Sequence, residues 1–354
     1  MSVFNSQSGF RYIPPLMKKG VYFSYKLTGF WLAGGLLAML SLIGKATPEI
    51  ADQHSPGLAM TPAIKKSRAT QLRAHVEALA TGIGERNMFT PNSLARAAEY
   101  IRHQWETQGY EVAAYPYIVR GQEVENLEVA LKGTEFPEEV ILVGAHYDTV
   151  PGSPGANDNA SGVAALLELS HKLAGKELPR SLRFVAFVNE EPPFFKTPKM
   201  GSRVYARMAR ERGKRLKGVV VLETIGYYRN EPDTQKYPPL FGLFYPDRGN
   251  FVGFVSNLRS RGLLHRAVGS FRKHSNFPLE YLSAPALIPG VDWSDHSSFW
   301  RYGYDAIMVT DTALYRYPYY HSFQDTPDKL DYDSLVQLTV GLYGMLLELA
   351  SADL

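Results

Sequence analysis

The sequence predicts an α/β fold in which helices cover both faces of a mixed, mostly parallel central sheet. Two observations predict it. Four apolar runs have the length and composition of strands that are buried on both faces; they are 140–143, 181–189, 218–222 and 305–310. Segments with the apolar periodicity of helices occur between or before these runs, as in 162–173.

The composition limits the classes of function. The chain has 354 residues and 45% hydrophobic content, enough for one large or two small domains. Its formal net charge is only +3, and its basic residues are spread out, so no nucleic-acid partner is expected. There is no cysteine, which excludes disulfides, thiolate nucleophiles and Cys-ligated zinc. A bound metal ion must therefore be held by His, Asp or Glu.

The N-terminal part predicts export. Residues 1–26 are basic and aromatic, and 27–44 contain no charged residue. This uncharged stretch is at the lower limit of a membrane span, roughly 17 to 25 residues, and longer than a usual signal-peptide core of about 7 to 15. Positive charges precede it, so the N-terminus should stay cytoplasmic and the rest should be translocated. We expect 27–44 to be a membrane anchor or, alternatively, the core of a cleaved signal peptide, which would leave a periplasmic or secreted protein. Met17 is an alternative start.

The remaining chain is expected to hold a linker at 45–66 and one folded domain at 67–354. The linker assignment rests on its prolines and its few large apolar residues. Within the domain, apolar periodicity predicts helices and alternation predicts antiparallel or edge strands. The helices are 69–80, 93–108 and 259–273, the strands are 111–117, 125–131 and 251–255, and 230–239 reads as a surface loop.

Residues with metal-binding side chains follow the first apolar run. His146 and Asp148 come at its end and, being two residues apart on a strand, share a face. The imidazole can therefore bind a cation while the carboxylate fixes its tautomer. After a Gly/Pro-rich loop, Asp158 stands just before the helical segment 162–173. Each residue alone has a common structural explanation, such as a helix N-cap for Asp158.

The other three runs also lead to acids or histidine. Glu190 and Glu191 end the second run, and the prolines after them prevent the strand from continuing. Glu223 ends the third run, and His321 follows the fourth after an aromatic loop. Ligands of open α/β sheets bind at the carboxyl ends of parallel strands. The four strand ends together therefore predict one metal site.

Six separated motifs then indicate a family. They are H-Y-D, G-A-N-D-N-A-S-G, N-E-E, L-E-T-I-G-Y, S-D-H-S-S-F and H-S-F-Q-D-T. In order and spacing they resemble the zinc exopeptidases of clan MH, which include secreted bacterial aminopeptidases, glutamate carboxypeptidase II and glutaminyl cyclases. The resemblance covers roughly residues 67–350 and implies a single zinc-exopeptidase domain.

The resemblance implies two zinc ions held by five ligands. His146 and Glu223 would complete the first site and Glu191 and His321 the second, with Asp158 bridging both ions. Many members have Asp where this chain has Glu223, and a small backbone shift would accommodate the extra methylene. The family also implies a cis peptide after Asp158.

Three further acids receive roles from the resemblance. Glu190 would be the general base, Asp148 the partner that orients His146, and Asp295 another acid near the site. The aromatic loop 315–320 and the pair Phe194–Phe195 flank the expected ligands. They would line a pocket for an apolar side chain or belong to the core.

The implied activity is that of a metal-dependent exopeptidase, first of all a di-zinc aminopeptidase acting on peptides with a free N-terminus. The alternatives are a glutaminyl cyclase with one zinc, a carboxypeptidase, and a non-catalytic, membrane-anchored binding module. The complete set of five ligands favours the two-metal hydrolase over the cyclase.

Overall fold

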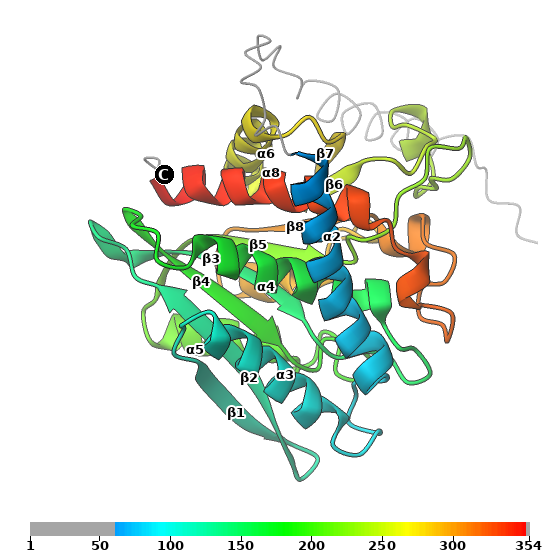
Figure 1. Cartoon of the computed structure of the whole chain (residues 1–354). Coiled ribbons are helices and arrows are strands. Elements are labelled where there is room, and N and C mark those ends of the chain that lie inside the picture. Colours follow the sequence, from blue (N-terminus) through cyan, green and yellow to red (C-terminus); the bar gives the residue numbers. More distant parts are fainter. Residues whose placement is uncertain (1–60, 352–354) are drawn as a thin grey trace, which may run out of the picture. The chain divides into compact units, whose positions relative to one another are not determined.

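The structure, a computed structural model, describes residues 61–351 (Figure 1). The expected segments 1–26 and 27–44, and most of the expected linker, lie outside the described residues. Helix α2 (Pro62–Glu77) begins inside the last part of that linker. Proline suits the first turn of a helix, and the Thr61 hydroxyl accepts a hydrogen bond from the Ile64 N–H at 3.3 Å. The first described helix thus begins at Pro62, five residues before the expected start of the domain at Ser67.

Eight strands form one sheet, in the order β1-β2-β4-β3-β5-β8-β6-β7. Their bounds are β1 Ala113–Val119, β2 Gln122–Leu131, β3 Phe136–His146, β4 Arg180–Phe187, β5 Arg215–Glu223, β6 Val252–Ser256, β7 Leu279–Ser283 and β8 Ala306–Thr310. The central strands β4, β3, β5 and β8 are parallel, and antiparallel pairs join β2 to β4 and β6 to β8. The predicted mixed, mostly parallel sheet is confirmed.

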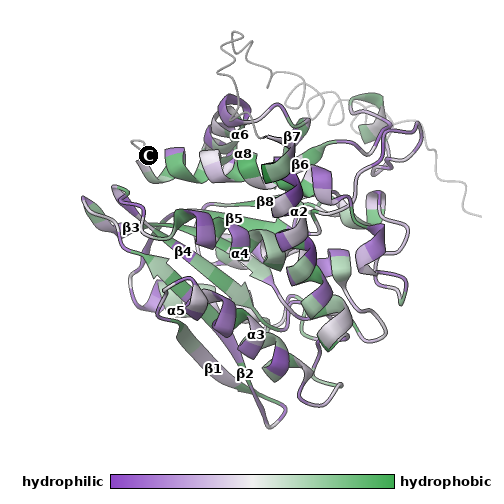
Figure 2. Cartoon of the chain, viewed as in Figure 1, coloured by the Kyte–Doolittle hydropathy of each residue, from purple (hydrophilic) through white to green (hydrophobic). Residues whose placement is uncertain are grey.

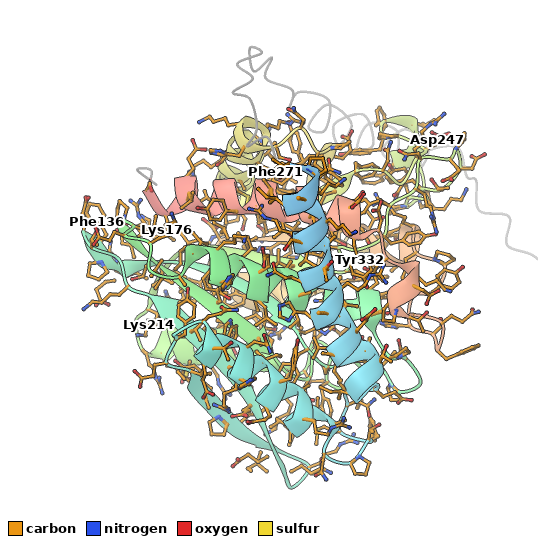
Figure 3. The ribbon with its side chains drawn as sticks, in the orientation of Figure 1. Phe136, Lys176, Lys214, Asp247, Phe271 and Tyr332 are labelled. Atoms are coloured by element: carbon orange, nitrogen blue, oxygen red, sulfur yellow. The ribbon has the colours of Figure 1, made fainter. Side chains whose placement is uncertain are left out.

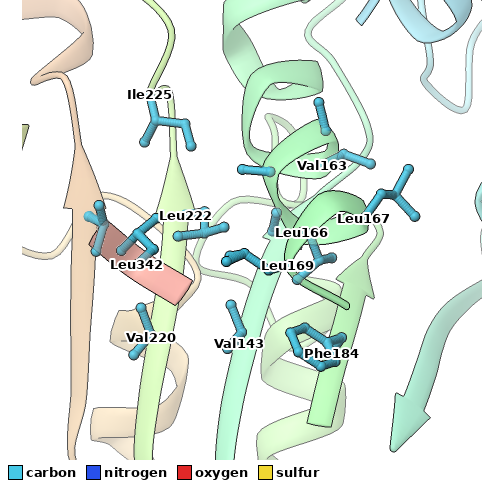
Figure 4. Packing of buried hydrophobic residues seen from close by; sticks show 14 of the residues in the cluster. Val143, Val163, Leu166, Leu167, Leu169, Phe184, Val220, Leu222, Ile225 and Leu342 are labelled. Atoms are coloured by element: carbon cyan, nitrogen blue, oxygen red, sulfur yellow. The ribbon is translucent and has the colours of Figure 1, made fainter. Parts of the chain in front are cut away.

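Helices cover both faces of this sheet. On one face the core includes α2, α3 (Ser93–Thr107), α4 (Gly162–Leu173), α6 (Arg261–His274) and α8 (Tyr332–Ser351), and on the other it includes α5 (Gly201–Glu211) and α7 (His296–Arg301). Successive side chains of β3 point to opposite faces of the sheet. Ile141 and Val143 pack into the first core, and Val140 and Leu142 pack into the second. Figure 4 shows Val143 and Phe184 of the sheet below the side chains of α4, and Val220 on the neighbouring strand. This two-sided burial explains the unbroken apolar runs in the sequence.

Helix α8 was not expected from the sequence. Among the residues that the structure describes, it alone is long and apolar enough to cross a membrane. However, 61% of its apolar window is buried inside the domain, where it packs against α2 and α6. Figure 2 shows it and the central strands as largely hydrophobic. Its burial is that of a core helix.

Candidate metal centre

The expected site residues gather at the carboxyl ends of the central strands. His146 is the last residue of β3 and Glu223 is the last residue of β5. Glu190 and Glu191 follow β4, and His321 lies in the loop after β8. Asp158 lies in a short π-helical segment, Ala156–Ser161, that leads into α4. Adjacent parallel strands thus bring residues together that are far apart in the sequence.

Five of these residues form two groups that share Asp158. In the first group, His146 Nε2 lies 3.3 Å from Asp158 Oδ1 and 3.3 Å from Glu223 Oε2. In the second, His321 Nε2 lies 3.1 Å from Asp158 Oδ2 and 3.3 Å from Glu191 Oε2. Each oxygen of Asp158 therefore faces a different group, as a bridging carboxylate requires.

The donor set fits divalent cations. Within each group, one ligand atom from every residue lies within 4.8 Å of the others. Asp158 Oδ2 and Glu191 Oε1 are buried and accept no hydrogen bond. Buried carboxylates are costly unless they are paired or coordinate a metal. Imidazole nitrogens with carboxylate oxygens suit zinc, and also manganese or cobalt.

The two groups differ in their access to solvent. The side chains of His146 and Asp158 are 1% and 3% exposed, whereas that of His321 is 32% exposed. The first group is therefore enclosed by the domain, and the second opens outward through His321. A substrate would approach the centre from the side of the second group.

The backbone is strained at three positions beside these side chains. Asn189, Thr224 and His321 have φ values of 58°, 48° and 54°, in the left-handed region that residues other than glycine rarely adopt. Asn189 precedes Glu190, and Thr224 follows Glu223. Such conformations cluster at functional sites. The Asp158–Asn159 peptide is cis, as the resemblance implied.

Glu223 is held in place by two hydroxyl groups. Ser294 Oγ donates to its Oε2 at 2.6 Å, and Thr224 Oγ1 donates to its Oε1 at 2.6 Å. The carboxylate reaches the first group although it is one methylene longer than the Asp of many family members. These hydroxyls fix the orientation of the longer side chain.

Asp148 positions three neighbours at once. Its Oδ1 lies 3.4 Å from His146 Nδ1, an ion-pair distance longer than a good hydrogen bond. The same carboxylate accepts hydrogen bonds from the backbone N–H groups of Glu190 at 3.0 Å and Glu191 at 3.1 Å. Asp148 is therefore a positioning residue that ties the β3 end to the loop after β4.

Glu190 and Asp295 are buried acids outside both groups. Burial raises the pKa of Glu190 well above its usual range, and the nearby charges of Glu191 and Glu223 raise it further, against the opposing effect of His146. Burial also raises the pKa of Asp295 to about 7, and neither of its carboxylate oxygens accepts a hydrogen bond. Glu190 is next to Glu191 in the chain and belongs to neither ligand group.

Asp325 supports the bridging residue and was missed by sequence reasoning. It accepts hydrogen bonds from the Asn157 and Asp158 N–H groups at 2.8 and 3.1 Å, and from the Tyr317 hydroxyl at 2.7 Å. The sequence did offer a way to find Asp325, because it belongs to the same H-S-F-Q-D-T motif as His321.

Arg86 was also missed, and no motif marks it. Its side chain is fully buried and donates to five backbone carbonyls, those of Leu79, Gly84, Tyr147, Pro154 and Gly155. Burial lowers its pKa to about 10, so the guanidinium remains charged. Arg86 clamps the loop that connects His146 to Asp158.

A cavity of about 130 Å³ adjoins the centre, and its lining includes Glu223 and Tyr320. The Tyr320 ring stacks on the His321 imidazole, with 3.9 Å between the ring centroids. Tyr315 also lines the cavity, whereas Tyr317 is buried beside Asp325. The expected aromatic loop thus contributes to both a pocket and the core. Phe194 and Phe195 do not line this cavity.

Residues 126–343 match peptidase family M28. The chain is 35% identical to the uncharacterized protein YfbL of Escherichia coli over 286 residues, covering 78% of this chain and 87% of YfbL. It is 22% identical to leucine aminopeptidase 1 of Paracoccidioides brasiliensis, covering 87% of this chain and 82% of that protein.

Solved structures share the fold. A zinc aminopeptidase from Bacillus subtilis superposes with a TM-score of 0.65 at 15% identity, covering 80% of this chain and 95% of that one. A glutaminyl cyclase from Bacteroides thetaiotaomicron gives a TM-score of 0.60 at 17% identity, with coverage of 79% and 97%. At these identities, the similarity describes the architecture alone.

Proposed function

The chain belongs to peptidase family M28, and from this we propose that it is a zinc-dependent aminopeptidase that removes residues from the N-termini of peptides. One observation carries the proposal, namely the pair of ligand groups that share Asp158, with Glu190 beside them. Relatives that are named leucine aminopeptidase support the choice of substrate end. A solved zinc aminopeptidase of the same fold supports the choice of metal.

His146, Asp158 and Glu223 would hold one zinc ion, and Asp158, Glu191 and His321 the other. When bound, two such ions polarise a scissile carbonyl and lower the pKa of an attacking water. The protein's own part is to fix the ligands. Asp148 accepts a hydrogen bond from the backbone N–H of Glu191, and Asp325 accepts one from the backbone N–H of Asp158.

Glu190 is the proposed general base. In the carboxylate form it would accept the proton of the attacking water, and its carboxyl group would then give that proton to the leaving amine. Its backbone N–H is bonded to Asp148 Oδ1, and its side chain is 6% exposed. The carboxyl group is therefore held in place and shielded from bulk water during the transfer.

The decisive experiment is mass spectrometry of defined peptides incubated with the full-length protein and zinc, with Glu190→Gln alongside. Some peptides carry N-terminal Gln. We expect the wild type to shorten peptides stepwise from the N-terminus. The variant should be slower by about 10³-fold, within the usual range for a lost acid-base group, and should keep its metal content.

Each other result excludes the proposal in a recognisable way. Cyclisation of N-terminal Gln without shortening would identify a glutaminyl cyclase, whose fold this chain shares. Intact peptides with two bound zinc ions would indicate a binding module. Substantial turnover by Glu190→Gln would place the base elsewhere.

We also propose that the protein is exported and held at the membrane by residues 27–44. The uncharged stretch and the basic residues before it support this topology. Protease treatment of intact cells or spheroplasts, followed by membrane fractionation, tests it. External protease should digest the domain. In untreated cells the domain should sediment with the membranes. A protease-protected domain would contradict export.

A further inference from the structure

Four residues on the floor of the cavity form one row across the sheet. The strand register pairs Glu223 of β5 with Thr310 of β8, Thr310 with Gly253 of β6, and Gly253 with Glu280 of β7. Residues paired in this way project from the same face of a sheet. All four line the cavity. The row therefore leads from an expected metal ligand to a second acid, Glu280.

The length of this row determines which substrate side chains can reach from Glu223 to Glu280. Three strand spacings of about 4.8 Å place β7 roughly 14 Å from β5. The side chains of Glu223 and Glu280 occupy part of that distance. A lysine or arginine side chain, which reaches roughly 6 to 7 Å from its α-carbon, suits the remainder. A leucine side chain ends well short of Glu280.

The middle of the row is open because of Gly253. Its φ is not in the left-handed region, so the backbone does not require glycine here. A Cβ at this position would meet only ordinary contacts, the nearest being Thr310 O at 3.4 Å. The core cluster on this face, formed by α5, α7 and the central strands, contains no residue of β6 or β7. Glycine thus leaves room in the part of the sheet that this cluster does not cover.

Aromatic rings form the walls of the cavity. Tyr237, Phe241 and Tyr245 make one wall, with ring centroids 5.7 Å apart for Tyr237 and Tyr245 and 6.4 Å apart for Phe241 and Tyr245. The hydroxyls of Tyr237 and Tyr245 donate to the backbone carbonyls of Pro246 and Tyr281. Their hydroxyl groups are therefore engaged, and the rings remain for a ligand. Aromatic faces accept apolar groups and also attract cations.

Glu280 is a partly exposed carboxylate in the lining of this cavity. It is half-buried, and no residue that the structure describes donates a hydrogen bond to its carboxylate or forms an ion pair with it. Burial raises its pKa, while the charge of Arg272 opposes the rise. A half-buried carboxylate among aromatic rings is costly unless a cation pairs with it.

The neighbouring cations do not satisfy Glu280. Arg272 comes from α6 and lies over the Tyr281 ring, 5.5 Å from its centroid. Tyr281 is next to Glu280 on β7, and adjacent strand residues face opposite sides of the sheet. Lys236 lines the cavity but is exposed to solvent and makes no ion pair with Glu280 within the described residues.

We propose that this cavity receives the side chain of the substrate's N-terminal residue and selects a cationic one, lysine or arginine, through Glu280 and the aromatic walls. The inference rests on the proposed aminopeptidase function and names its substrate class. A purely apolar preference would need only the aromatic walls. The Glu280 carboxylate, which has no ion-pair partner among the residues that the structure describes, is what favours a cation.

Matched pairs of N-terminal residues test the charge alone. Arginine and citrulline have nearly the same shape, and norleucine is lysine without its terminal ammonium group. Only arginine and lysine are charged. We expect the full-length wild type to have about tenfold or higher kcat/KM for arginyl over citrullinyl amides, as for a partly buried ion pair with cation–π contacts. In Glu280→Gln the ratio should fall to about one, while leucyl amide turnover changes little.

Asp247→Asn is the matched control. Asp247 is exposed and lies in the same loop as the aromatic wall, but it does not line the cavity (Figure 3). Asp247→Asn removes one negative charge, as Glu280→Gln does, so a general change in surface potential would affect both variants. We expect its arginine-to-citrulline ratio to equal that of the wild type.

The outcomes separate the two proposals. If the wild type cleaves citrulline or norleucine amides as well as arginine or lysine amides, the cationic preference is wrong and the peptidase stands. If no amide is cleaved, the aminopeptidase function fails. Calorimetric binding of arginine amide and citrulline amide to Glu190→Gln then still tests the pocket, because it needs no turnover. Equal affinities would overturn the inference.

Discussion

The centre of the sheet and its β6–β7 edge are built in different ways. Strands β4, β3 and β5 are buried on both faces, and their carboxyl ends carry the residues of the metal centre. Toward β6 and β7 the strands are five residues long, and much of the cavity above them is walled by loop residues such as Tyr237, Trp293 and Tyr315. Packing on both faces holds the candidate metal ligands in place, whereas the loops determine which substrate side chains fit the cavity. Variants in the two regions should therefore change different quantities.

Of the three variants that distinguish these regions, the one that removes a ligand on the exposed side of the centre should have the largest effect. His321→Ala removes the imidazole of the second group but leaves His146, Asp158 and Glu223 in place. The variant should keep one of two zinc equivalents and lose at least about 100-fold in kcat, because a second ion no longer clamps the reacting groups. Elemental analysis of dialysed protein and amide turnover measure both.

The control for that experiment is His103→Ala, which removes an exposed histidine of α3. It should leave metal content and activity unchanged. Two equivalents of zinc in His321→Ala would remove His321 from the ligand set. The contrast between the centre of the sheet and its β6–β7 edge would then lose its clearest support.

A smaller effect is expected from loosening the centre without removing a ligand. The Glu190 and Glu191 N–H groups donate to different oxygens of Asp148, and Asp148→Asn replaces one of these oxygens by an NH2 group that cannot accept. Zinc affinity should fall by about 10- to 100-fold, the usual result of losing such a partner. Competition with a chelator measures this. Unchanged affinity would mean that packing alone holds the loop after β4.

The smallest effect is expected at the loop-walled end. Gly253→Val fills the middle of the cavity floor without backbone strain. Turnover of N-terminal residues with long side chains should fall by about tenfold, roughly the selectivity that one or two methylene groups provide. Alanyl amide turnover and zinc content should not change. An equal loss for all substrates would show that the variant disturbs β8 and the centre as well.

The same contrast explains what the sequence could predict. The four apolar runs became β3, β4, β5 and β8 because burial on both faces leaves an unbroken hydrophobic signal. Ligand candidates stood out because they interrupt that signal at strand ends. The resemblance to the zinc exopeptidases already grouped them into two sites, and the topology, which places β3 between β4 and β5, shows why these strand ends meet.

What could not be predicted depends on contacts between distant segments. The five-residue β7 has the length of many loops and shows no clear period. Helix α5 is amphipathic but was not predicted, although its apolar and arginine residues alternate with helical spacing. Arg86 and Glu280 look like ordinary surface charges in the sequence. Arg86 is recognisable only once its guanidinium meets five carbonyls from two segments, and Glu280 only once the register aligns it with Glu223.

The clamp made by Arg86 bears on how far the catalytic unit extends. The match to the family begins at residue 126, but the guanidinium that holds the loop between His146 and Asp158 comes from forty residues earlier in the chain. It can reach that loop only when the segment after α2 is docked, since Leu79 and Gly84 supply two of its acceptors. A fragment trimmed to the matched region would therefore keep every expected ligand and still lack the means to order them. Helices α2 and α3 therefore belong to the smallest fragment expected to be active, and they are not a removable extension.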